Sequence, residues 1–286
     1  MIASFQAELM KLWRRPAVWV LGGILVAAIV ALGYVVSWLV VSHIPAGSDL
    51  ARTVRDPASL KLAYYPVNWV KNTLGIGGEL GGAMCMVLGV LVVGSEYGWG
   101  TFKTVLTQTP ARLATFGGRL GAVALVIGIY ELAIFLATAV TSVVIALIDN
   151  HSITWPAAGT VIAALAAEWL VFATWTAFGM LLAFLFRQSG LAVGIGLVYM
   201  LILEGLVLSL LSQVGGQWIL ELRKLLPGTA ASALADSFGQ SGSALATRAA
   251  AQALIGAQRA TITLGVYVVA FCAIAAIVFR RRDVME

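Results

Sequence analysis

Long apolar stretches without charge are the feature of this sequence that most limits its fold. Residues 17–41 contain no charged side chain, and residues 74–93, 120–148, 157–186 and 191–211 contain at most one charge each. A further stretch, residues 261–279, again contains none. About 20 apolar residues suffice for a helix to cross the hydrocarbon core of a bilayer. The sequence therefore predicts an all-α polytopic bundle of six transmembrane helices.

The composition agrees with a membrane domain and leaves no stretch for a separate soluble one. Hydrophobic residues make up 60% of the 286 residues and charged residues 11%, against about 45–50% and about 25% in soluble domains. The net charge of +5 would suit a nucleic-acid partner. The basic residues, however, cluster beside apolar stretches, as they do in membrane proteins. We expect membrane lipid as a partner, no nucleic acid, and one transmembrane domain over residues 1–286.

The distribution of basic residues predicts the orientation. With six spans, both termini lie on one side, and that side holds four short basic groups. These are Lys11, Arg14 and Arg15; Lys103, Arg112 and Arg119; Arg187; and Arg280, Arg281 and Arg282. The basic residues of the opposite side lie in longer segments, where charge has less influence on orientation. We expect a multi-pass protein of a bacterial plasma membrane with both termini in the cytoplasm.

The segment before the first span has its own pattern. Ile2, Phe5, Leu9 and Leu12 recur at helical spacing in residues 1–16, and basic residues follow near the end of the segment. This pattern predicts an amphipathic helix that lies in the membrane interface. It turns into the bilayer at Pro16, and we expect it to remain uncleaved, because the apolar stretch that follows is too long for a signal peptide.

Two outer segments also contain structural signals. Residues 43–73 include Tyr64, Tyr65 and Trp69 just before the second span, which predicts an aromatic anchor at the interface. Residues 213–260 contain apolar residues at helical spacing, then a breaker at residues 227–228 and an alanine-rich stretch. We interpret this outer segment as short amphipathic helices in or on the outer leaflet; a solvated loop is the alternative.

The segment between the second and third spans, residues 94–119, is the sharpest local motif. Thr101 can cap a short helix whose apolar side is formed by Phe102, Val105 and Leu106. Residues 109–110 then resemble a second cap and a first-turn proline leading into the third span. An apolar edge with a polar rim suits docking to another protein. A connector that merely lies on lipid headgroups would have the same composition.

A family resemblance favours docking. The pattern Glu96-Tyr97-x-x-Gly-Thr101-x-Lys103-x-x-Leu106, followed by Pro-x-Arg112, resembles permease subunits of type 2 ABC (ATP-binding cassette) exporters. Gly98 stands where that family often has a basic residue. Three further features resemble the family, and they extend the resemblance over nearly the whole chain. They are the amino-terminal Phe5-x-x-Glu8-Leu9-x-Lys11-Leu12 segment ending in Arg14-Arg15-Pro16, the outer Leu226-Pro227, and the ending Phe279-Arg280-Arg281-Arg282-Asp283-Val284.

The resemblance implies that the chain forms half of a transmembrane pathway, as a homodimer or with a sibling permease. Residues 94–119 would act as the coupling segment for a cytoplasmic ABC ATPase subunit. ATP and Mg²⁺ would be bound by that partner, because this chain has no Gly-x-x-x-x-Gly-Lys-[Ser/Thr] loop. The expected cargo is an amphipathic or hydrophobic molecule, such as a drug, a peptide or a lipid-linked molecule, and export is the expected direction. The residues that would contact the ATPase are Glu96, Tyr97, Thr101, Phe102, Lys103, Leu106 and Arg112.

Three carboxylates lie well inside otherwise uncharged spans: Glu131, Glu168 and Glu204. A charge at the bilayer centre costs at least about 2.5–3.5 kcal/mol, so such residues usually face the bundle interior or a cavity. They are candidates for the translocation pathway. Structural hydrogen bonds between helices, or a position nearer the interface, are the other interpretations.

Two other classes of function make different demands on the sequence. An intramembrane metalloenzyme would need clustered histidines, and only His43 and His151 occur, both outside the spans. No catalytic, cofactor-binding or metal-ligating residue is predicted, and we expect the chain itself not to be an enzyme. A secondary carrier driven by an ion gradient is the alternative. Carriers of that kind usually show internal repeats and broken helices, and neither is evident in this sequence.

Overall fold

The computed structural model describes residues 2–43, 60–98, 112–207, 210–211, 217–239 and 255–281, and helices are the only regular elements in these ranges. The prediction of an all-α fold is therefore confirmed for this part of the chain. The α-helices are α1 (Ile2–Arg14), α2 (Pro16–Val30), α3 (Ser37–Ser42), α6 (Trp69–Ile76), α7 (Gly82–Gly98), α9 (Arg112–Ile148), α10 (Ala158–Phe186), α11 (Ser189–Leu197), α13 (Gln217–Arg223), α14 (Pro227–Asp236) and α16 (Ala257–Arg281). Three π-helical segments, η1 (Ala31–Val36), η4 (Gly77–Gly81) and η5 (Val198–Val207), continue α2, α6 and α11, and two short 3₁₀ turns, η2 (Leu62–Tyr64) and η3 (Pro66–Asn68), precede α6.

Five helices of the described chain are long and apolar enough to cross a membrane. They are Pro16–Ser42, Leu113–Ile148, Ala158–Phe186, Ser189–Val207 and Ala257–Arg280. Each of them contains most or all of one predicted span. The second predicted span, residues 74–93, corresponds to a shorter apolar helix, Gly82–Ser95. The five helices fit a multi-pass membrane protein.

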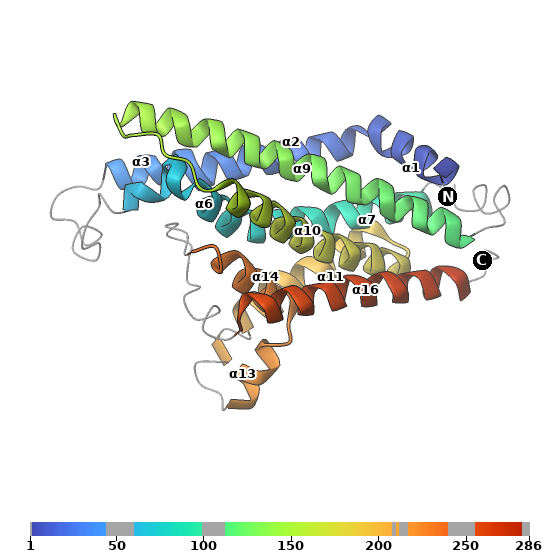
Figure 1. The fold of residues 1–286 in the computed structure, drawn as a ribbon. Helices are drawn as coiled ribbons and strands as arrows, with labels where there is room; N and C mark the ends of the chain where they lie inside the picture. Colours follow the sequence, from blue (N-terminus) through green and yellow to red (C-terminus); the bar gives the residue numbers. More distant parts are fainter. Residues whose placement is uncertain are drawn as a thin grey trace.

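Helix α10 is the centre of the bundle, with α7 and α16 packed against it (Figure 1). Most of its side chains are buried, whereas α16 and the α11–η5 helix expose most of theirs. Small residues let α7 approach α10 closely. A methyl group built on Gly89 would overlap the carbonyl group of Thr176, and one built on Gly179 would overlap that of Met86. The backbones of the two helices are therefore in direct contact, which is typical of helix pairs in membranes.

The bundle has two distinct ends. At one end, which we call the connector end, α1 lies beside the start of α9, and the end of α16 lies at this same end of the bundle (Figure 1). The ring of Phe116 on α9 lies 6.1 Å from that of Phe279 on α16 and 6.0 Å from that of Phe184 on α10. Residues 99–111 join α7 to α9 at this end. The opposite end contains the turn between α9 and α10, and we call it the loop end.

The aromatic residues at the start of α6 and just before it are buried against the bundle, and their place at the membrane interface stays a prediction. Tyr64 and Tyr65 are 1% and 5% exposed, and Trp69 is 7% exposed. The indole of Trp69 donates to Thr138 Oγ1 at 2.9 Å on α9, and Tyr65 donates to Asp149 Oδ2 at 3.0 Å. Thr138 on α9 and Asp149 in the turn after α9 thus accept the donor groups of Trp69 and Tyr65, so burying these two side chains leaves neither donor unpaired.

The described residues between 213 and 260 contain two short helices, α13 and α14, and their position at the outer leaflet stays a prediction. Helix α13 projects from the bundle (Figure 1) and exposes Trp218 and Leu222. Pro227 is the first residue of α14, where its missing N–H costs no helical hydrogen bond. Tyr267 of α16 donates to the carbonyl oxygen of Leu225 at 2.8 Å, and this bond ties the α13–α14 turn to the last span.

Candidate functional site

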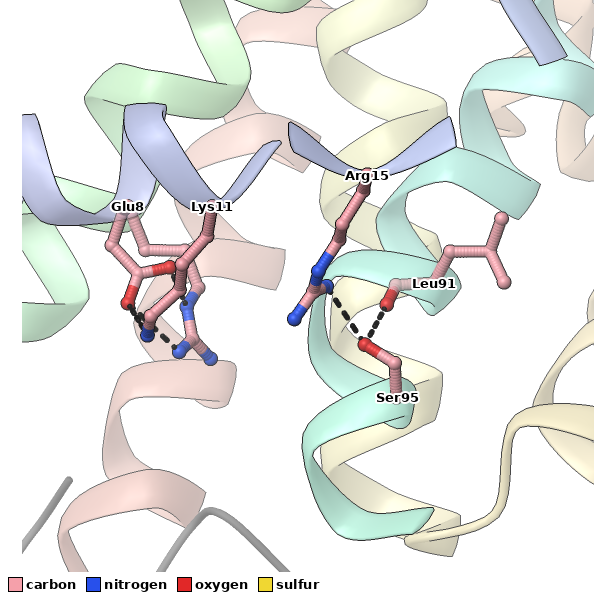
Figure 2. A network of polar contacts seen from close by, with 6 residues as sticks. Glu8, Lys11, Arg15, Leu91 and Ser95 are labelled. Carbon is pink, nitrogen blue, oxygen red and sulfur yellow. Dashed lines mark hydrogen bonds and ion pairs between the residues drawn. The ribbon is translucent and has the colours of Figure 1, made fainter. Parts of the chain in front are cut away.

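At the connector end, α1 is fixed to the base of α9 by a buried ion pair. The Glu8 carboxylate lies 3.3 Å from the Arg119 guanidinium, and both side chains are almost fully buried. Lys11 donates to the same carboxylate at 2.9 Å (Figure 2). Burial alone would raise the pKa of Glu8, but the charges of Arg119 and Lys11 outweigh it and hold that pKa below its usual value. Glu8 is therefore a carboxylate at neutral pH, and α1 is packed against protein along this face.

A second contact joins the start of α2 to the end of α7. Arg15, between α1 and α2, donates from its guanidinium to Ser95 Oγ at 2.8 Å, and Ser95 in turn donates to the Leu91 carbonyl oxygen at 2.6 Å (Figure 2). The backbone of α1 also lies close to α9, because a methyl group on Gly118 would come within 2.7 Å of the backbone nitrogen of Phe5. Helix α1 is thus bonded to α9, and Arg15, the residue after α1, is bonded to α7. These are the two helices that residues 99–111 connect in the sequence.

Most predicted ATPase-docking residues lie outside the described chain. These are Thr101, Phe102, Lys103 and Leu106. Glu96 and Tyr97 belong to the last turn of α7, and Arg112 is the first residue of α9; only their backbone is described. The structure therefore locates the two ends of the predicted docking segment beside α1, and the docking residues themselves remain a prediction.

The three predicted intramembrane carboxylates are all buried, but they do not form one site. Glu131 of α9 is 4% exposed and Glu168 of α10 is 1% exposed. These two lie close enough for their charges to interact. Glu204, in the π-helical segment η5, lies instead against α14, where its Oε1 accepts a 3.0 Å hydrogen bond from the backbone N–H of Thr229. Glu204 therefore caps the first turn of α14, a position that favours a negative charge.

Two buried polar clusters were not predicted. In the first cluster, Tyr34 of η1 donates to the carbonyl oxygen of Trp69 at 3.0 Å and is hydrogen-bonded to Thr73 Oγ1 at 2.8 Å. Thr73 donates in turn to Thr138 Oγ1 at 3.0 Å. Threonine and tyrosine within apolar stretches carry no charge signal, and these three residues come from different helices, so no feature of the sequence indicated this cluster.

The second cluster lies at the loop end of the bundle. Asp149 Oδ2 accepts hydrogen bonds from Trp38 Nε1 at 2.9 Å and from Tyr65 at 3.0 Å. The ring of His151 stacks on Tyr65 with centroids 4.1 Å apart. Burial and the bond to Asp149 raise the pKa of Tyr65 to about 12. Tyr65 is therefore a neutral donor at neutral pH, and the cluster joins the start of α3 to the α9–α10 turn.

Comparison with known protein families identifies the family of the chain. The family model described as "Protein of unknown function (DUF2705)" matches residues 82–285. The chain belongs to the DUF2705 family. No curated protein matches the chain.

The matched DUF2705 region begins at the first residue of α7 and reaches past the end of α16. It therefore contains residues 94–119 and all three buried carboxylates. Helices α1 and α2, which hold the connector end together, precede it. Within the described part of this DUF2705 chain, no three histidine, cysteine or acidic side chains gather as a set of metal ligands.

Proposed function

We propose that this chain is the membrane-spanning permease subunit of an ATP-driven exporter of the type 2 ABC class. One structural observation supports the proposal most. Helix α1 and Arg15 are bonded to both helices that flank the predicted coupling segment, through Glu8 to Arg119 on α9 and through Arg15 to Ser95 on α7. A force that an ATPase applied to residues 99–111 would pass into α7, α9 and the first span together.

In this proposal the chain has six spans. Elements α6, η4 and α7 follow one another without a break from Trp69 to Gly98, and a helix of this length is long enough to cross a bilayer. With this span included, α1 and the end of α16 lie on one side of the membrane, where Figure 1 draws them at the same end of the bundle. We assign that side to the cytoplasm of a bacterial plasma membrane.

The proposed assembly contains a cytoplasmic ABC ATPase that binds ATP and Mg²⁺, and a second permease, either another copy or a sibling. The chain itself would catalyse no reaction. The exposed apolar faces of α16 and α11–η5 suit contact with lipid or with a second permease. An amphipathic or hydrophobic cargo is proposed from the family resemblance, together with export as the direction.

The proposal is tested by purifying the tagged full-length chain from its native membrane. We expect a stoichiometric subunit with a phosphate-binding loop to co-purify, and the complex to hydrolyse ATP. Deleting residues 101–107 is expected to abolish both results while membrane insertion persists. The matched control is Glu221→Gln on α13, an exposed residue paired with Lys224 away from the connector end. Equal recovery of the ATPase with the deletion variant would refute docking at this segment.

A second candidate, a carrier driven by an ion gradient, is favoured by the buried Glu131 and Glu168. Intramembrane carboxylates mark ion and proton pathways in transporters. The π-helical segments also interrupt three apolar helices, and such irregularities often occur at functional sites. The two candidates separate in reconstituted vesicles. Solute movement by the chain alone, driven by an ion gradient, would establish the carrier, whereas the exporter requires the ATPase subunit and ATP.

A further inference from the structure

Two buried carboxyl groups inside the bundle lie within range of each other's charge, and neither forms an ion pair among the described residues. Glu131 comes from the middle of α9 and Glu168 from α10. In each side chain, Oε1 is buried and has no hydrogen-bond partner. Glu131 reaches the backbone of Trp169, the residue next to Glu168, and the two carboxyl groups lie within range of each other's charge.

Within the described part of the chain, no basic side chain is paired with either of these carboxyl groups. A methyl group on Gly77, in η4, would overlap Glu168 Oε1, so the absence of a side chain there makes room for the carboxyl group. The titratable groups that face the pair are the thiol of Cys85 on α7 and, near that thiol, the phenol of Tyr130 on α9. Among the described residues, no salt bridge is formed by either carboxyl group.

Two other buried carboxylates each have a partner that favours their charge. Glu8 is paired with Arg119, and Oε1 of Glu204 accepts the N–H of Thr229 at the start of α14, whereas Oε2 of Glu204 has no hydrogen-bond partner. Both arrangements stabilise a negative charge. Glu131 and Glu168 have neither a cation nor a helix N-terminus among the contacts that the structure describes.

The protonation state of the pair follows from the cost of burying a charge. An ionised carboxylate buried without a partner is so costly that the group binds a proton instead. Two neighbouring carboxylates add mutual repulsion, which again favours protonation of at least one of them. We propose that Glu131 and Glu168 form an exchangeable proton-binding site between α9 and α10. One carboxylate takes up a proton to become a carboxylic acid, and its release to water regenerates the carboxylate.

This proposal does not depend on the ATPase. It concerns a site in the membrane-spanning helices and stands whether or not residues 94–119 bind a partner. The site gives an exporter or a carrier a group that changes charge inside the bundle, so failure of one proposal leaves the other intact.

The experiment is covalent labelling of the full-length protein with dicyclohexylcarbodiimide, an apolar reagent that reacts with protonated carboxyl groups. At neutral pH we expect an adduct on Glu131 or Glu168, located by mass spectrometry of peptides, and none on the exposed Glu221. Infrared spectroscopy supplies a second measurement. The carbonyl band of a protonated carboxylic acid is expected in the native protein, lost in the double variant Glu131→Gln/Glu168→Gln, and unchanged in Glu221→Gln.

Two results would overturn the proposal. One is the absence of both the adduct and the protonated-carboxyl band at neutral pH, which would mean that both groups are ionised. The other is suppression of labelling by sodium or potassium ions at constant pH, which would assign the site to a metal cation. Because labelling uses the unmodified chain, a folding defect in the glutamine variants does not affect the first result.

Discussion

The contact between α7 and α10 makes a sharp prediction about glycine. Replacing Gly179 by alanine puts a methyl group 2.9 Å from the carbonyl carbon of Met86 and closer still to its oxygen. The obstacle is backbone, which cannot rotate away as a side chain can. The two helices must therefore move apart, and the other contacts along their interface loosen with them. Gly194 on α11 is the matched control, because a methyl group there meets nothing within 4 Å.

The magnitude follows from two opposing effects. Alanine stabilises a helix interior by about 1 kcal/mol relative to glycine. Overpacking a close contact costs about 1–3 kcal/mol. Gly194→Ala should show only the helix stabilisation by alanine, whereas Gly179→Ala should show the same stabilisation and, in addition, the cost of overpacking. Because both variants share the stabilisation by alanine, we expect their free energies of unfolding to differ by the overpacking cost of about 1–3 kcal/mol, with Gly179→Ala the less stable.

The assay is unfolding of the purified chain in mild detergent by increasing amounts of a denaturing detergent, followed by tryptophan fluorescence. Gly89→Ala, which meets the Thr176 carbonyl from the other helix, should behave like Gly179→Ala. Equal midpoints for Gly179→Ala and Gly194→Ala would refute the backbone contact between α7 and α10.

Two further predictions concern the ends of the bundle. Glu8→Gln leaves Arg119 with a buried charge that has lost an acidic partner, and breaking such a pair costs about 3–5 kcal/mol at most; a thermal-unfolding midpoint unchanged at neutral pH would contradict the ion pair. The pKa of Glu8 is lower in the folded protein than in the unfolded chain. The ionised Glu8 carboxylate therefore contributes fully to the free energy of unfolding above about pH 4.3, and this contribution is lost as the pH falls through the folded-state pKa. The wild type and Glu8→Gln should accordingly converge in stability in acid. At the loop end, Asp149→Ala removes the acceptor of Trp38 and Tyr65 and should lower the free energy of unfolding by about 1.5–3 kcal/mol. Asp149→Asn should lower it less, because the amide oxygen still accepts a hydrogen bond. Identical thermal-unfolding midpoints for both variants and the wild type would contradict this cluster.

The spans were predictable from the sequence because hydropathy reports directly on lipid contact. Residues 17–41 lie within the helix Pro16–Ser42, and residues 157–186 match Ala158–Phe186 to one residue. The second span was less clear. Its glycines and Glu79 lower the apolar character of the segment before Gly82, and η4 interrupts the α-helix there.

Helix contacts were only partly predictable. Glycines four residues apart often mark close helix contacts in membranes, and Gly77 and Gly81 do lie against Glu168 and Phe172. Gly190 and Gly194 have the same spacing, but methyl groups there would meet nothing within 4 Å. The closest backbone approaches, at Gly89 and Gly179, do not belong to a pair of this spacing, because which face of a helix meets a neighbour depends on the packing of the whole bundle.

The carboxylates illustrate the same limit for the site. Charge counting identified Glu131, Glu168 and Glu204 as unusual, and all three are buried. It could not tell that two would pair while the third caps α14, because those partners come from other helices. The Glu8 ion pair was likewise hidden, since a charged residue near the amino terminus normally lies in the interface or in water.

The central claim is that residues 94–119 bind a cytoplasmic ATPase, and photo-crosslinking tests it most directly. With p-benzoylphenylalanine in place of Phe102, ultraviolet light should link the full-length chain to a subunit that carries a phosphate-binding loop. The same amino acid in place of Trp218, an exposed residue of α13, should form no such link. Crosslinks from position 102 to lipid alone, with the native membrane intact, would contradict the account.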